Sequence, residues 1–436
     1  PMDWLLLISA PFIGIVVGLM PALGATLLLI LMYPWLVTFD VATIIMFYAI
    51  VVGARDFSGS VSALNFGLLG EVTSVPILKE RNTIVNDNKN MNALRNTMLG
   101  SLFGVAFGMI ILWISVSQAA HYPWLLRSDV TATMLGLAIL FLSAWKGNKM
   151  WINCLLMLLG FFIGKVGFDA ATNTDFMVFG NMYLSGGIPI WPVLFGLYAM
   201  PMLFEVVTQS RPEYLDVSKQ KITSPIKFFT MLRSGTIGAV CGLVPFVGST
   251  VSSQMAYSIE HKFYPKDNSD HALARVSAAE TSNNAGQVTM LIPLLVLGIA
   301  VQGSEVVLIN ILSQVGWDVR DLVTQDFMMQ LMIALVLGAL VSGVLCYNLV
   351  IHLTKWFVKY FAVLLGALSL LFVANILHIG FQADQLWYYL IVFLISLVLG
   401  VISRKYKIDH VPTILIFLLF DSFDGLARVL YLIYLA

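Results

Sequence analysis

Apolar segments follow one another along nearly the whole chain, and only short polar stretches separate them. A helix needs roughly 20 mainly apolar residues to cross the hydrocarbon core of a bilayer, and many of these segments approach that length. The shorter segments predict half-helices. We therefore predict an all-α polytopic membrane protein with about 10–14 membrane segments. The segments lie at 4–20, 24–38, 41–54, 96–118, 129–145, 150–168, 187–208, 230–243, 246–260, 276–290, 327–350, 360–378, 385–403 and 412–434.

The composition supports a lipid-embedded protein. Of the 436 residues, 59% are hydrophobic and 11% are charged, whereas a soluble protein carries about a quarter charged residues. The formal net charge is zero, and the three cysteines and six histidines show no metal-ligand spacing. We therefore expect no nucleic-acid partner and no resident cofactor. The first apolar segment lacks a basic leader and a small-residue cleavage site, so we expect a retained helix.

Lysine and arginine are unevenly distributed among the polar stretches, and basic residues favour the cytoplasmic side of a membrane. The basic loops, which we predict to be cytoplasmic, are 79–95, 146–149, 209–233, 261–275 and 404–407. The loops that are acidic or poor in basic residues, which we predict to lie on the opposite side, are 33–40, 119–128, 169–186 and 314–326. A single path of the chain through the membrane satisfies all of these assignments.

One motif occurs once in each half of the chain. "GLMPALGAT" begins at Gly18 and "GLVPFVGST" begins at Gly242, so the copies are 224 residues apart (242 minus 18) and share the pattern G-L-x-P-x-x-G-x-T. The chain after the first copy runs toward the basic loop 79–95, whereas the chain after the second runs toward the acidic loop 314–326. This predicts an inverted repeat, which is typical of secondary transporters. The predicted parts are a first membrane repeat 1–208, a cytoplasmic linker 209–229 and a second, inverted repeat 230–436.

Each copy of the motif places a proline and a glycine inside apolar sequence. Proline removes a backbone N–H and clashes with the preceding turn, and glycine lets the backbone open. In lipid the freed backbone groups need protein or a water-lined cavity around them, so a paired break indicates a binding site. Thr26 and Thr250 bring a hydroxyl to each half-helix start, where free N–H groups suit an anion. The alternative is a packing kink in which each threonine bonds to its own backbone.

A stretch of small and polar residues with short apolar runs follows each break, at 53–78 and 278–309. The apolar runs are too short to span a membrane, so each stretch predicts a helix that runs into a re-entrant hairpin. Polar amides such as Asn283 and Asn284 can form several hydrogen bonds, and ionisable groups at membrane depth indicate function. Pairing of Arg55 with Asp56, or a place at the water interface, is the alternative for those two residues. The ionisable groups are Arg55, Asp56, Glu71, Glu280 and Glu305.

These stretches also resemble a known family. Both motif copies, "ARVSAAETSNNA" at 274–285, "GKVGFDAATNTDFMVFGNMYLSGGIPIWPVLFGLYAM" at 164–200 and "VPTILIFLLFDSFDGLARVL" at 411–430 are similar to the large membrane permease subunit of the tripartite tricarboxylate transporter family. The resemblance implies a bacterial inner-membrane permease that imports carboxylates by ion symport. It also implies a small four-helix membrane subunit and a periplasmic substrate-binding protein as partners.

The chain departs from this family at the hairpin tips. Relatives typically carry a Pro-Gly-Thr-like first tip, where this chain has Leu69, Gly70 and Glu71, and Pro-Gly-Ser-Gly at the second tip, where it has Ala300, Val301, Gln302 and Gly303. Arg55 stands where glutamine is common, and Ala279 stands where proline is common. Glu71 places a potential negative charge where an anion should approach. Either the substrate is not the usual tricarboxylate, or Glu71 points away, is protonated or binds the cation.

We predict a substrate site between the two breaks and the two hairpin tips, with sodium or a proton as the coupling ion. The predicted substrate contacts are Pro21, Gly24, Ala25, Thr26, Gly59, Ser60, Gly70, Glu71, Pro245, Gly248, Ser249, Thr250, Asn283, Asn284, Gln302, Gly303 and Ser304, and the cation-binding candidates are Thr26, Thr250 and Asn284.

The predicted function is secondary active import of a small carboxylate-type anion by alternating access of an elevator kind, with a homo-oligomer left open. The alternative is a membrane channel or scaffold subunit without coupled transport. A channel calls for a continuous polar pore lining, whereas the polar groups here cluster at two symmetric breaks. An intramembrane enzyme would need a nucleophile paired with a base, or a metal cluster, and the sequence shows neither.

The charge pattern makes a testable prediction about sidedness. A single cysteine at residue 88 should react with a membrane-impermeant thiol reagent only from the cytoplasmic side, and one placed within 314–326 only from the outside. Labelling of residue 88 from the outside would contradict the inverted repeat.

Overall fold

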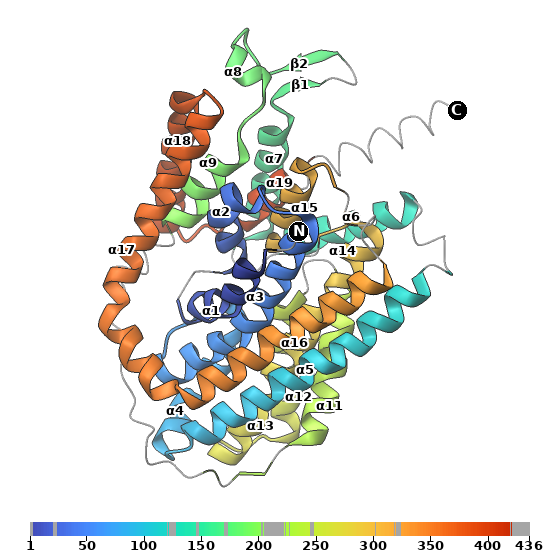
Figure 1. Ribbon diagram of the computed structural model, residues 1–436, viewed down its shortest axis with the longest axis vertical. Helices are drawn as coiled ribbons and strands as arrows, with labels where there is room; N and C mark the ends of the chain where they lie inside the picture. The colour runs from blue at the N-terminus through green and yellow to red at the C-terminus, as the bar shows by residue number, and fades with distance from the viewer. Residues whose placement is uncertain are drawn as a thin grey trace. The chain divides into compact units, whose positions relative to one another are not determined.

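The computed structural model describes residues 3–20, 24–119, 121, 128–144, 148–169, 173–201, 204, 222, 224–225, 227–244, 248–300, 302–317, 319, 324–418 and 420. Helices form nearly all of the regular structure in these ranges, as Figure 1 shows. Strands β1 (Gly167–Asp169) and β2 (Thr174–Phe176) form a small antiparallel sheet with Gly167 opposite Phe176.

The chain divides into two compact units, and each unit contains chain from both predicted halves. Unit 1 is formed by residues 1–126 and 210–361, and unit 2 by residues 127–209 and 362–436. The linker predicted at 209–229 separates two copies of a repeat rather than two compact units, so it stays a prediction.

Unit 1 contains both copies of the motif and both predicted hairpins. Its helices are α1 (Trp4–Leu19), α2 (Ala25–Leu36), α3 (Val41–Val61), α4 (Val75–Asn86), α5 (Asn90–Ala119), α11 (Phe228–Gly242), α12 (Gly248–Phe263), α13 (Ser269–Thr289), α14 (Leu291–Leu297), α15 (Gly303–Gln314) and α16 (Gln325–Asn348). A π-helical turn, Ser62–Phe66, extends α3, and a 3₁₀ turn, Val72–Ser74, precedes α4.

Unit 2 is built from the remaining helices. These are α6 (Ser128–Ser143), α7 (Met150–Lys165), α8 (Met182–Ser185), α9 (Ile190–Leu194), the π-helical turn Phe195–Ala199, α18 (Leu386–Lys405) and α19 (Val411–Leu418). Helix α17 (Val350–Gln382) begins in unit 1 and ends in unit 2. Within unit 2, α19 packs on α7, and α18 packs on α9 and the π-helical turn.

Every predicted membrane segment contains a helix in the structure. Among the described residues, the helices long and apolar enough to cross a membrane are Val41–Phe66, Asn90–Gln118, Gln325–Asn348, Lys355–Phe381 and Leu386–Lys405. Shorter apolar helices are Trp4–Leu19, Ala25–Leu36 and Met150–Lys165. The prediction of an all-α, multi-pass membrane protein is thereby confirmed. The number of membrane segments, about 10–14, stays a prediction, and so do the inverted repeat and the re-entrant hairpins.

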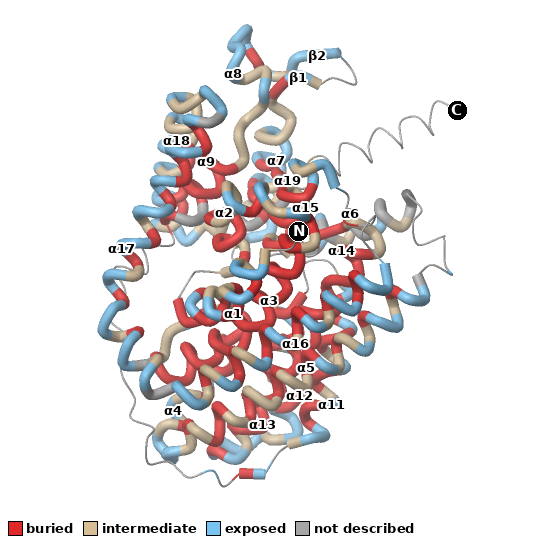
Figure 2. The backbone as a smooth tube through the Cα atoms, viewed as in Figure 1, coloured by how far each residue is buried: buried red, intermediate tan, exposed pale blue. Residues whose placement is uncertain are grey.

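Helices α3 and α13 form the buried centre of unit 1 (Figure 2). Every residue of α3 except Ala42 is buried, and so is every residue from Ala272 to the end of α13. The side chain of Asp40 caps α3 by accepting a hydrogen bond from the Thr43 backbone N–H at 3.0 Å, and Asn268 caps α13 through the N–H of His271 at 3.0 Å. Although α13 is rich in polar side chains, it is enclosed by other helices rather than by lipid or water.

Glycines allow this enclosure because they let helix backbones approach closely. Gly100, Gly104 and Gly108 form a stripe on α5 that faces α13, and a Cβ atom added at Gly104 would lie 2.5 Å from the carbonyl oxygen of Thr281. Gly238 on α11 meets the backbone of Ser282 from another side of α13. In a close-packed interior such backbone contacts leave no room for a side chain.

The same arrangement occurs around α3. Gly14 and Gly18 on α1 face α3, and a Cβ atom added at Gly14 would lie 2.7 Å from the carbonyl oxygen of Val51. The two motif copies are 224 residues apart, and adding this distance to positions 14 and 18 gives 238 and 242. Gly238 and Gly242 are the two glycines of α11 that pack on α13. The helix before each motif thus packs through a matched glycine pair on the long helix that comes after that motif.

The helices are interrupted at both motifs, as the sequence predicts. Helix α1 ends at Leu19, Met20 is extended (φ −80°, ψ 120°), and α2 begins after an extended Gly24 (φ −72°, ψ 169°). Helix α11 ends at Gly242, and α12 begins at Gly248, whose φ is +40°. Pro21 and Pro245 lie outside the described residues.

The glycine stripe on α5 predicts a strong effect of adding a side chain there. Gly104→Leu forces apart the backbones of α5 and α13, and we expect it to destabilise the fold by roughly 1–3 kcal/mol or more. Gly366→Leu on α17 is the control, because a Cβ atom there meets nothing within 4 Å. Thermal unfolding of the purified variants in detergent measures the difference. Equal melting temperatures for the two variants would contradict the packing role of Gly104.

Candidate functional site

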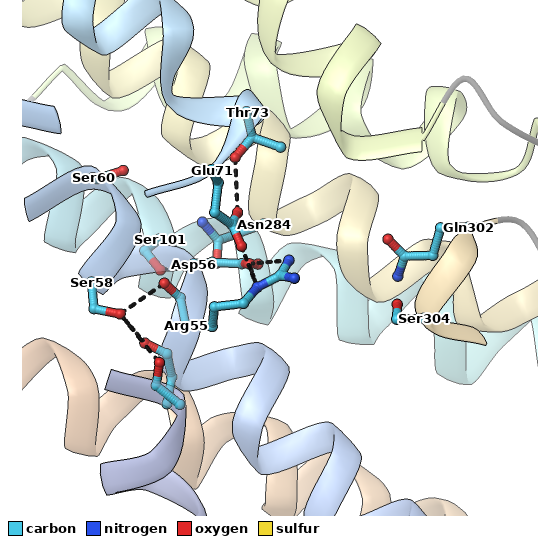
Figure 3. Close-up of polar contacts among 12 residues, drawn as sticks. Arg55, Asp56, Ser58, Ser60, Glu71, Thr73, Ser101, Asn284, Gln302 and Ser304 are labelled. Carbon is cyan, nitrogen blue, oxygen red and sulfur yellow. Dashed lines mark hydrogen bonds and ion pairs between the residues drawn. The ribbon is translucent and has the colours of Figure 1, made fainter. Parts of the chain in front are cut away.

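A buried ionic network lies at the C-terminal end of α3, and Figure 3 shows its members. The guanidinium of Arg55 donates a hydrogen bond from Nη2 to Asp56 Oδ1 at 3.1 Å, and its Nε forms an ion pair with Glu71 Oε1. Glu71 also accepts a hydrogen bond at Oε2 from the hydroxyl of Thr73 at 2.9 Å. The three charged side chains are 10% or less exposed. Arg55 and Asp56 therefore do pair with each other, and both side chains are buried in the protein.

The turns after α3 bring Glu71 back to this network. Gly67, with φ +66°, ends the π-helical turn in the left-handed region that favours glycine. A Cβ atom at Gly70 would meet the carbonyl oxygen of Gly18 and lie 3.0 Å from the Cα of Gly59. Only glycine fits there, so the first hairpin tip lies against the end of α1. The end of α1 and the turn at Gly70 are thus brought together, and the Glu71 side chain points to Arg55.

A second polar chain links α5, α13 and α3. Ser101 Oγ donates to Asn284 Oδ1 at 2.9 Å, and Asn284 Nδ2 donates to the carbonyl oxygen and Oε1 of Glu280 at 3.0 and 3.1 Å. Glu280 Oε2 accepts from the hydroxyl of Ser60. Both ends of the Asn284 amide are therefore engaged, and this residue positions Glu280.

The buried network carries more negative than positive groups. The charges of Asp56, Glu71 and Glu280 interact with one another. Glu280 accepts hydrogen bonds from the neutral side chains of Ser60 and Asn284, and among the described residues no basic side chain forms an ion pair with it. Unbalanced charge is costly in a region screened from water. The arrangement therefore calls for a proton or a bound cation.

The second hairpin region lies against the first half of α3. Helix α14 ends at Gly298, whose φ is +68°, and Gln302 precedes α15. The hydroxyl of Tyr48 accepts from Gln302 Nε2 at 3.2 Å and shares a hydrogen bond with Ser304 Oγ at 3.1 Å. In Figure 3, Gln302 and Ser304 lie to one side of the group around Arg55. Gly303 is the first residue of α15, and among the described residues no hydrogen bond or ion pair joins this second group to Glu280 or Asn284.

The remaining predicted residues lie at the two helix starts. Ala25, Gly248 and Ser249 are buried, whereas Gly24, Thr26 and Thr250 are half-buried. The carbonyl groups to which Thr26 and Thr250 could bond in the preceding turn, at residues 22–23 and 246–247, lie outside the described residues, so the alternative of a self-bonded threonine stays a prediction. The start of α12 packs on the end of α13, where a Cβ atom at Gly248 would lie 2.8 Å from Met290 Sδ.

Some members of the network were absent from the predicted contacts. Arg55, Asp56 and Glu280 carried the signal of ionisable groups in apolar sequence, and they do lie at the centre. Ser101 and Tyr48 carried no signal, because a single serine or tyrosine in a membrane helix does not reveal its partner. Asn283 is buried, and its Oδ1 accepts no hydrogen bond from the residues that the structure describes.

Other ion pairs connect helices of unit 1 without unbalanced charge. Arg275 on α13 pairs with Glu80 on α4 through two contacts of 2.7 Å, and Arg233 on α11 pairs with Glu260 on α12. Near the start of α13, a hydrogen bond of 2.8 Å from the Lys89 ammonium lowers the pKa of the Asp270 carboxyl. Because each is matched by an opposite charge, we read these pairs as structural.

Comparison with known proteins agrees with this picture. Residues 5–415 match the family model described as "Tripartite tricarboxylate transporter TctA family". A similar protein from Agrobacterium vitis, described as "Uncharacterized 52.8 kDa protein in TAR-I ttuC' 3'region", is 25% identical over 301 residues. That alignment covers 66% of this chain and 59% of the relative's length. No solved structure was found to match the chain.

The family model covers nearly all of the described residues, including both breaks, the ionic network and the helices that enclose it. The family is one of transporters rather than of enzymes, in agreement with the membrane-spanning helices. The chain belongs to the tripartite tricarboxylate transporter TctA family.

Proposed function

We propose that the protein is the large permease subunit of an ion-coupled symporter that imports a small carboxylate-type anion across the bacterial inner membrane. A periplasmic binding protein would deliver the substrate, and a small four-helix membrane subunit would complete the complex. The observation that carries the proposal is the buried ionic network where a broken helix, a hairpin tip and α13 meet. Buried ionisable groups at membrane depth are typical of ion and substrate pathways.

The order of helices supports an inverted repeat. The series α1, α2, α3, α4 and α5 has a counterpart in α11, α12, α13, α15 and α16, and α4 and α15 are both 12 residues long. Helix α3 packs on α16 in the same way that α13 packs on α5, so each long central helix contacts the last helix of the other series. Duplicated halves that exchange helices in this way favour alternating access.

The elevator-type proposal assigns the site to unit 1. Both breaks, both hairpin regions and the ionic network belong to that unit. In this mechanism unit 1 would carry bound substrate and ion, while unit 2 would supply the remaining helices of the permease.

The backbone starts of α2 and α12 are the proposed contacts for the substrate anion. A helix N-terminus presents free N–H groups and partial positive charge. Arg55 is a poor primary contact, because two carboxylates already neutralise it. The excess of buried carboxylates means that a cation or proton must be present when an anion binds nearby. Each ligand should then tighten the other by the same factor.

Uptake into proteoliposomes tests this function. The permease, reconstituted with its small subunit and binding protein, should accumulate a carboxylate only under an inward sodium or proton gradient. Asn284→Leu removes the support of Glu280 and should lower uptake by about tenfold or more, since a hydrogen bond to a charged group is lost. The matched control is Asn375→Leu, a buried amide of α17 that bonds to its own helix. Gradient-independent flux would instead indicate a channel.

The ion pair between Arg55 and Glu71 makes a separate prediction. Both residues depart from the family pattern, and each compensates the charge of the other. Arg55→Gln leaves the buried carboxylates of Asp56 and Glu71 without their cation, and we expect it to destabilise the fold by about 3–5 kcal/mol. Glu71→Thr leaves Arg55 paired with Asp56, so we expect a smaller loss. In a thermal unfolding assay the double variant should be more stable than Arg55→Gln alone, because it also removes one of the two carboxylates that Arg55 neutralises. Additive losses would show that the two departures are independent.

A further inference from the structure

One face of α13 carries four polar side chains, and the neighbouring helices provide hydrogen-bond partners for only some of their polar atoms. Successive residues of a helix are rotated by about 100°, so Glu280, Asn283, Asn284 and Gln287 fall within an arc of roughly 100°. The contacts of α13 identify this face. Glu280 touches Ser60 of α3, while the backbone at Thr281 and Ser282 meets the glycines of α5 and α11 on other sides.

Two amide oxygens on this face have no hydrogen-bond donor. Asn283 and Gln287 are 2% and 3% exposed, and Asn283 Oδ1 and Gln287 Oε1 accept no hydrogen bond in the part of the chain that the structure describes. They are four residues apart on one helix, which places their side chains next to each other. Asn284, in contrast, uses both its oxygen and its nitrogen. A buried acceptor without a partner is costly, so these oxygens indicate a missing positive group.

The charge of the surroundings points to the same kind of ligand. Asp56, Glu71 and Glu280 interact electrostatically, while Arg55 is the basic side chain that pairs with two of them. Hard cations prefer oxygen ligands such as carboxylates and amide carbonyls. Because the two free oxygens are neutral amides and the carboxylates already hold other partners, a singly charged cation fits better than a divalent one.

We propose that α13 binds a sodium ion through Asn283 Oδ1 and Gln287 Oε1, with the carboxylate of Glu280 beside it. This inference rests on the proposed function, because the bound sodium is then the ion that couples to carboxylate import. It moves the ion from the predicted candidates Thr26, Thr250 and Asn284 to a neighbouring pair of amides, with Asn284 as a positioning residue for Glu280.

Sodium-dependent thermal unfolding of the purified full-length chain tests the site without substrate. At constant ionic strength, replacing choline chloride with sodium chloride should raise the melting temperature. Gln287→Leu and Asn283→Leu should each raise the sodium concentration for the half-maximal shift by about tenfold or more. Asn375→Leu should leave it unchanged. If the leucine variants do not fold, Gln287→Glu provides the test, since it keeps an oxygen and should retain the sodium response.

Three results would overturn the site. They are an equal response to choline and sodium, an unchanged sodium response in Gln287→Leu, and loss of the response in Gln287→Glu.

Uptake assays separate this inference from the proposed function. Uptake that follows a pH gradient and ignores sodium leaves the symporter standing and rejects the sodium site. A sodium response that is lost in Gln287→Leu, in a protein without uptake, supports the site and rejects the transport function.

Discussion

The structure of unit 1 depends on burying the polar helix α13 inside a protein that lies in lipid. Polar groups without partners cost several kcal/mol each in a bilayer, and neither lipid tails nor loosely packed side chains can supply those partners. The solution is close enclosure by α5, α11, α12 and α3, with glycines where the backbones meet. The glycine stripe on α5 lets that helix approach α13 closely enough for Ser101 to reach Asn284. The polar network is thus a product of backbone approach rather than of the polar residues alone.

The sequence predicts the elements well and the partners poorly. Apolar runs locate the helices, because a membrane helix must cover its own backbone with apolar side chains. The two motifs locate the breaks, because proline and glycine act on the local backbone. Which residue meets Glu280 depends on how distant helices pack, and nothing near Ser60 or Ser101 in the chain reveals it. The glycine stripe on α5 was a readable signal, since small residues at four-residue spacing mark close helix contacts.

The departures from the family pattern become intelligible as a pair. Read separately, Arg55 is a buried cation and Glu71 is a buried anion. Read together, they are an ion pair that ties the first hairpin tip to α3 beside the end of α1. The sequence alternatives for Glu71 stay predictions, and the geometry adds that its carboxylate is paired with Arg55. Asp56 and Glu71 together carry more charge than Arg55. The positive charge of Arg55 therefore does not by itself make an anion-binding site.

The polarity of α13 also bears on how the chain is assembled in the membrane. A helix with an arginine, a glutamate, a glutamine and two adjacent asparagines does not partition from the insertion machinery into lipid on its own. Helices α5 and α11 are synthesised earlier and carry the glycine faces that receive it. Insertion of α13 is therefore coupled to its docking on those two helices. Biogenesis of this part of the protein then becomes a tertiary folding step, and a nascent chain with a damaged glycine face would fail at the membrane before the polar network forms.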